Sequence, residues 1–141
     1  MSALIFVAYA TAKLLAYAAW CALGLRIVGA EASPRAAFRL GIIRWCIGLA
    51  FGIIIFFAVG SIEAQQTASR YFAIYTPTRV VEWAIIAFLI VVRRNLGGTS
   101  RSKLVLLLAI WCIGGIGVSF VTDLLSPDGL QGRFCVGRCL C

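Results

Sequence analysis

The chain contains no histidine, and only five of its 141 residues are acidic. Histidine is needed for His-ligated haem, for many zinc sites, and as the general base of Ser-His-Asp and Cys-His catalytic sites. Its absence excludes these sites, and with them a small bis-histidine cytochrome subunit. We therefore assign no catalytic residue, no metal site and no cofactor.

Charged side chains of either sign are also scarce, at 13% of the chain, whereas 62% of the residues are hydrophobic. A soluble domain has about a quarter charged residues and about half apolar ones. A soluble fold of this size could not bury so much apolar surface, because small domains expose a large share of their area. The sequence therefore predicts an integral membrane protein with the lipid bilayer as its main partner, built as a single transmembrane domain over residues 1–141.

Basic residues outnumber acidic ones by 13 to five, which gives a net charge of +8. No basic nucleic-acid-binding motif is present, and the arginines cluster between apolar runs, as they do in cytoplasmic loops. We expect no nucleic acid partner.

Four apolar runs cover residues of about 3–25, 40–62, 77–92 and 104–122. A membrane-spanning helix needs about 20 apolar residues, and helices satisfy their own backbone groups within lipid. The pattern predicts an all-α bundle of four transmembrane helices with short loops. Thr76 and Pro77 are suited to the N-cap and first position of a helix, so the third helix is predicted to begin there, with Glu82 close to its outer boundary.

The loops after the first and third runs carry seven Arg and Lys residues, against four in the second loop and the tail. The positive-inside rule then predicts both termini on the outer side of a plasma or inner membrane. A cleaved signal peptide is the alternative for the first run. That run has no preceding basic residue and is long for a signal sequence, so we expect it to be retained.

Lys13 lies about ten residues into the first apolar run, where a charge costs about 2.5–3.5 kcal/mol on insertion scales. Tyr9 and Tyr17 are one helical turn away on the same face. With both termini outside, the outer half of the bundle gathers further acids and bases. We predict a polar cluster there, made of Lys13, Tyr9, Tyr17, Glu63, Arg70, Arg79, Glu82 and Asp123. Two interpretations stay open: a cavity open to the outside, or an ion-pair network that fixes helix register.

Small residues mark two of the runs. Gly48 and Gly52 form a GxxxG motif, and Gly114 and Gly115 form a second small patch. Such residues let helices pack closely, either within one bundle or at a homodimer interface. Arg44, near the inner end of the second run, is interpreted as an anchor to cytoplasmic headgroups.

Six cysteines divide evenly between the apolar runs and the tail over residues 123–141. Cys21, Cys46 and Cys112 are interpreted as small hydrophobic residues. The tail cysteines are candidates for a disulfide if they lie outside, for acylation if they lie inside, or for a metal site that would lack a fourth ligand. They are Cys135, Cys139 and Cys141.

Three functional hypotheses follow. The first is a non-catalytic subunit or scaffold that packs against other membrane subunits or against itself, favoured by the short loops and the lack of a catalytic set. The second is a small transporter or channel in which Lys13 and the outer carboxylates line a path, favoured by the charge within the membrane. The third is a membrane enzyme that acts on lipid.

Overall fold

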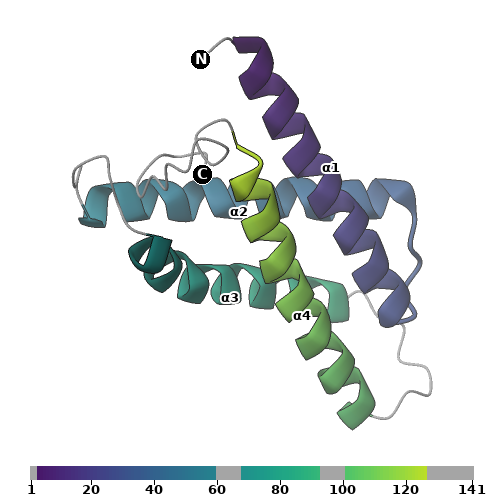
Figure 1. The fold of residues 1–141 in the computed structure, drawn as a ribbon. Helices are drawn as coiled ribbons and strands as arrows, with labels where there is room; N and C mark the ends of the chain where they lie inside the picture. The colour runs from purple at the N-terminus through teal and green to yellow at the C-terminus, as the bar shows by residue number, and fades with distance from the viewer. Residues whose placement is uncertain (1–2, 60–67, 93–100, 127–141) are drawn as a thin grey trace.

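The computed structural model describes residues 3–59, 68–92 and 101–126. Those residues form four helices and no strand (Figure 1). Each helix is long and apolar enough to cross a membrane, so the predicted four-helix membrane class is confirmed. The helices are α1 (Ala3–Ile27), α2 (Pro34–Val59), α3 (Ala68–Val92) and α4 (Arg101–Leu124).

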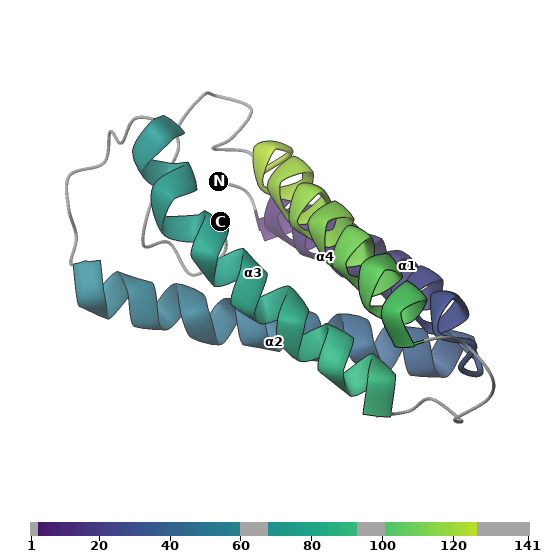
Figure 2. The same ribbon diagram turned by 90° about the horizontal axis from the view of Figure 1, so that it is seen from below.

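The helices form two crossing layers, and the most extensive contact, between α1 and α2, joins one layer to the other. Helices α1 and α4 run side by side in opposite directions, and they cross obliquely over α2 and α3 (Figures 1 and 2). The outward faces are apolar: Leu4, Phe57, Phe88 and Ile113 are all more than 60% exposed. This surface is what contact with lipid requires.

Aromatic side chains fill the core between the helices. Trp83 is 0% exposed and packs edge-on against Trp111, with 5.2 Å between the ring centroids. Trp20 on α1 and Trp111 on α4 also bond reciprocally. The Trp20 indole donates to the Trp111 carbonyl at 3.1 Å, and the Trp111 indole donates to the Trp20 carbonyl at 3.0 Å. This pair of bonds fixes the register between α1 and α4.

Two glycines of α4 make room for these rings. A Cβ on Gly115 would lie 2.6 Å from Cδ2 of Trp83, and a Cβ on Gly114 would overlap Trp20. Gly117 differs, because no atom of the described residues lies within 4 Å of its Cβ position. The small patch on α4 therefore accommodates rings from α1 and α3 within one bundle.

The start of the third helix differs from the prediction of 77–92. Helix α3 begins at Ala68, and Pro77 lies inside it. Proline is tolerated within membrane helices because side-chain hydroxyls and neighbouring helices satisfy the freed carbonyls. Pro77 removes the donor to the carbonyl of Ala73, four residues earlier, and beside it the Thr78 hydroxyl donates to the carbonyl of Ile74 at 3.1 Å. The predicted N-cap at Thr76 was wrong, and Glu82 lies two residues beyond Val80, the midpoint of α3, rather than near a boundary.

The second helix also begins earlier than the predicted residue 40, and it ends at Val59 rather than 62. It starts at Pro34, where the fixed φ of proline suits the first helical position. Ser33 caps it: the backbone N–H of Ala36 donates to the Ser33 hydroxyl at 3.2 Å. The first and fourth helices begin and end within three residues of the predicted bounds. Helix α4 continues through Asp123, the residue predicted to begin the tail.

Candidate functional site

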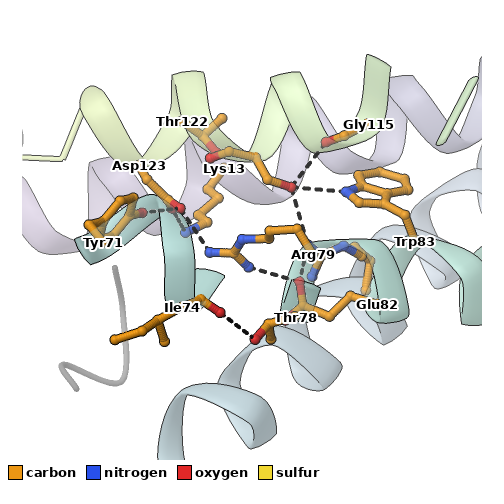
Figure 3. A network of polar contacts seen from close by, with 12 residues as sticks. Lys13, Tyr71, Ile74, Thr78, Arg79, Glu82, Trp83, Gly115, Thr122 and Asp123 are labelled. Atoms are coloured by element: carbon orange, nitrogen blue, oxygen red, sulfur yellow. Dashed lines mark hydrogen bonds and ion pairs between the residues drawn. The ribbon is translucent and has the colours of Figure 1, made fainter. Parts of the chain in front are cut away.

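Five charged side chains from the four helices meet inside the bundle, and each is at most 6% exposed. We call this set the charge network. It consists of Lys13 on α1, Arg44 on α2, Arg79 and Glu82 on α3, and Asp123 on α4. Figure 3 shows the part of it that surrounds Arg79.

Asp123 joins three of the helices. Its Oδ1 lies 2.5 Å from Nζ of Lys13, and its Oδ2 lies 2.8 Å from Nη2 of Arg79. The Tyr71 hydroxyl donates to the same Oδ2 at 2.8 Å. Lys13 also donates to the Tyr9 hydroxyl at 3.1 Å. Among the carboxylates of the described residues, the one that pairs with Lys13 is thus the farthest from it along the chain.

Glu82 extends the ion pairs to α2. Its Oε2 accepts from Nη1 of Arg79 at 2.9 Å and from Nη2 of Arg44 at 2.5 Å. Arg79 therefore bridges both carboxylates, and the ion pairs run continuously from Lys13 through Asp123, Arg79 and Glu82 to Arg44.

Helical spacing explains how α3 supplies its share of these groups. Tyr71, Tyr75 and Arg79 are four residues apart and lie on one face, and each is 3% exposed. Glu82 is three residues beyond Arg79, which is a pairing distance on a helix surface. The Arg79 guanidinium lies 5.6 Å from the centroid of the Tyr75 ring, one turn before it.

The charges lie near the middle of three helices. Lys13 is two residues before Leu15, the midpoint of α1, and Arg79 adjoins Val80, the midpoint of α3. Asp123 is the last residue but one of α4. It reaches the middle of α1 because the two helices are antiparallel and displaced along their length, as Figure 1 shows.

Arg44 is not the headgroup anchor that the sequence suggested. Its side chain is 0% exposed, and its Cζ lies 4.8 Å from the Tyr17 ring centroid and 5.0 Å from that of Trp83. Nη2 donates to Ser119 of α4 at 3.1 Å, and Ser119 also accepts from the Trp83 indole at 3.0 Å. The earlier start of α2 places Arg44 well inside the helix, too far from its ends to reach headgroups. A glycine one turn later on the same face, Gly48, is the sequence signal that could have indicated this.

Not every donor in this region has an acceptor. Among the described residues, Nε and Nη1 of Arg44 and the hydroxyl of Tyr17 are buried without a hydrogen-bond partner. Buried polar groups in proteins are nearly always hydrogen-bonded, so each such group calls for an explanation.

The structure brings together five of the eight predicted cluster residues in direct polar contact: Tyr9, Lys13, Arg79, Glu82 and Asp123. Tyr17 is adjacent, packed edge-on against Trp83 with 5.9 Å between centroids. Glu63 lies outside the described residues. Arg70 belongs to α3, but its side chain lies outside the described part of the chain. That the cluster serves as a binding site stays a prediction.

The remaining predicted residues fall into two groups. Gly52 is buried on α2. Cys135, Cys139 and Cys141 lie outside the described residues, so their chemistry stays a prediction. Within the described ranges, Cys21, Cys46 and Cys112 are free cysteines, and no group of three His, Cys, Asp or Glu side chains is placed to hold a metal ion.

Comparisons with known proteins give no further assignment. A scan against protein-family models, a search of curated proteins and a search of solved structures each found no match to this chain.

Proposed function

We propose that the chain is a small membrane transporter and that the charge network is where an ionic solute binds. The supporting observation is that charged side chains from four helices meet inside the bundle, near the midpoints of α1, α2 and α3, and are at most 6% exposed. Intramembrane charges cost about 2.5–3.5 kcal/mol each on insertion scales and mark ion or substrate pathways. A bundle that needed only to pack would be served as well by apolar side chains, since a buried ion pair is often no more stable than its apolar replacement.

The pairing within the network suits a site that has to change state. Arg79 contacts both Asp123 and Glu82, and Glu82 contacts both Arg79 and Arg44. Arg79 and Glu82 each have two ionic partners. A solute ion that displaces one partner of either residue leaves the second partner in place, so that residue keeps a counter-ion. Such an arrangement lets ion pairs exchange without leaving a charge alone in the membrane, which transport through this bundle requires.

The test is charge movement in proteoliposomes that contain the purified chain. Concentration jumps of sodium chloride, sodium nitrate, sodium lactate and lysine hydrochloride are applied, and transient currents are recorded. We expect a current with at least one salt and its loss in Lys13→Ala, with helix content and elution volume unchanged. Arg26→Gln is the control, because Arg26 is exposed at the end of α1. Absence of current with every salt, or an unaltered current in Lys13→Ala, would show that the proposal is wrong.

The non-catalytic subunit or scaffold is a second candidate, and one feature of the network favours it. Ion pairs that join four helices also fix the register in which the helices pack. For this function, purification from the native membrane should recover a stoichiometric partner or a homo-oligomer, and a stable monomer would contradict it. The network does not favour a lipid-acting enzyme, because Glu82 and Asp123 both accept from cationic side chains and so serve as counter-ions rather than as general bases.

A further inference from the structure

We propose that the solute is a small monovalent anion of the carboxylate class, bound by Arg44 with Tyr17 as a second donor. This inference rests on the proposed function, since it names the solute class of the same site. It depends on three features: unpartnered donors, the balance of buried charge, and the close fit of Arg44 against Gly48.

The unpartnered donors belong mainly to Arg44. A guanidinium has five N–H bonds. Those of Nη2 are taken by Glu82 and by Ser119 of α4. The other three, on Nε and Nη1, have no acceptor among the described residues, although the side chain is 0% exposed. An unsatisfied buried donor is destabilising, and more so when it is charged, so the arrangement is suited to an added acceptor.

Tyr17 supplies a further donor in the same region. Its hydroxyl has no hydrogen-bond partner in the described part of the chain, and the residue is 1% exposed. Its ring lies against the Arg44 guanidinium, and so does the ring of Trp83, with centroids 4.8 and 5.0 Å from Cζ. Because aromatic rings cover the guanidinium, an acceptor would reach it at its N–H groups, beside the tyrosine that carries the unpartnered hydroxyl.

The charge balance selects the sign of the ligand. The described part of the network has three cations and two carboxylates, which leaves an excess of one positive charge. A monovalent anion neutralises that excess, whereas a bound cation would double it. A carboxylate suits the donors better than a halide does, because its two oxygens can accept from separate N–H and O–H groups and guanidinium geometry matches carboxylates.

Gly48 makes room for the Arg44 guanidinium itself. A Cβ at this position would lie 3.0 Å from Nη1 of Arg44 and 3.6 Å from Oε1 of Glu82. The glycine therefore lets the guanidinium lie against its own helix without a side chain in the way. Gly48 acts as a positioning residue for Arg44, which is a different role from the helix–helix packing that the GxxxG motif suggested.

The test is a titration of the detergent-purified chain with sodium acetate, followed by tryptophan fluorescence because Trp83 lies against Arg44. Sodium sulfate at matched ionic strength is the salt control. We expect a saturable change with acetate and none that saturates with sulfate. Arg44→Gln should abolish the change, whereas Arg39→Gln, at an exposed position on the same helix, should leave it intact.

Tyr17→Phe is the variant that separates binding from folding. The hydroxyl has no partner to lose within residues 3–59, 68–92 and 101–126, so the unfolding midpoint should not fall. Loss of a donor worth about 0.5–1.5 kcal/mol should raise the dissociation constant for acetate by about twofold to tenfold. This variant decides the question if Arg44→Gln does not fold. Gly48→Ala should also raise the dissociation constant for acetate, although Glu82 and Ser119, the partners of Arg44, are unchanged.

The outcomes distinguish this inference from the proposed function. Equal, unsaturable changes with both salts, or wild-type affinity in Tyr17→Phe and Arg44→Gln, would overturn the inference. Specific acetate binding without a current from any salt would support the inference and refute transport. A current from lysine hydrochloride alone, with no acetate binding, would support transport and refute the anion.

Discussion

Asp123→Asn is the substitution that tests the charge network most directly. Asp123 accepts from Lys13, Arg79 and Tyr71, at 2.5, 2.8 and 2.8 Å. Asparagine keeps the shape but removes the charge, and its amide group turns one acceptor into a donor that faces other donors. Arg79 keeps Glu82 as its counter-ion, so most of the loss should fall on Lys13, which is left with the Tyr9 hydroxyl.

The magnitude follows from what each partner loses. Removing one member of a buried ion pair costs about 3–5 kcal/mol, because an uncompensated charge remains, and we expect Asp123→Asn to lie in that range. Lys13→Met should behave differently. It forfeits a charged hydrogen bond worth about 1.5–3 kcal/mol, but it also removes an ammonium whose burial costs about 2.5–3.5 kcal/mol. Asp123 keeps Arg79 and Tyr71, so the two effects nearly cancel.

The double variant gives the decisive result. With Lys13 replaced by Met, Asp123→Asn no longer leaves an unpaired ammonium, so we expect at least about 2 kcal/mol of the loss to be recovered. Unfolding is followed by tryptophan fluorescence as SDS is added to mixed micelles. Lys103→Met, exposed near the start of α4, is the matched control. Additive effects of the two substitutions, or a Lys13→Met cost equal to that of Asp123→Asn, would refute the reasoning.

Three further predictions concern packing, accessibility and topology. Gly115→Ala should destabilise the protein by about 1–3 kcal/mol, because its Cβ would lie 2.6 Å from Trp83. Gly117→Ala should stabilise it by up to about 1 kcal/mol, because no described residue lies within 4 Å of that Cβ position. Equal effects of the two substitutions in the same unfolding titration would contradict this. Cys46 is exposed and Cys21 is buried, so a lipid-soluble maleimide should label Cys46 first, and equal labelling rates would argue against the packing of α1. Tags on both termini of the chain expressed in a plasma membrane should be accessible from outside, and protection of both tags would reverse the predicted orientation.

The number of helices and the place of Lys13, at one end of the charge network, could be predicted from the sequence for related reasons. Lipid demands long apolar runs, which set the number of helices, and a charge within such a run has to find a partner inside the bundle. Lys13 therefore indicated a carboxylate partner, with Glu63, Glu82 and Asp123 as candidates. The sequence could not select Asp123, because that pairing depends on how α1 and α4 are displaced along each other.

The errors came from helix boundaries that apolar runs do not mark. Polar residues before Thr76 were interpreted as a loop, although Tyr71, Tyr75 and Arg79 share the spacing of one buried helix face. The late start of the third helix then placed Glu82 at a membrane boundary. The late start predicted for the second helix likewise made Arg44 an anchor. In both cases, an error in a predicted helix boundary assigned a buried charged side chain to the membrane surface.

The Lys13–Asp123 pair also has a consequence for how the protein is made. The two residues are 110 positions apart, and the partner of the lysine lies at the end of the last helix. At about 5–20 residues per second, the ribosome needs roughly 5–20 s to synthesise the intervening chain. During that time α1 carries an ammonium with no carboxylate from α4 beside it. We expect the first helix to stay at the insertion machinery, or to be displaced toward the interface, until the fourth arrives. Membrane integration of this chain would then be completed late and as a unit.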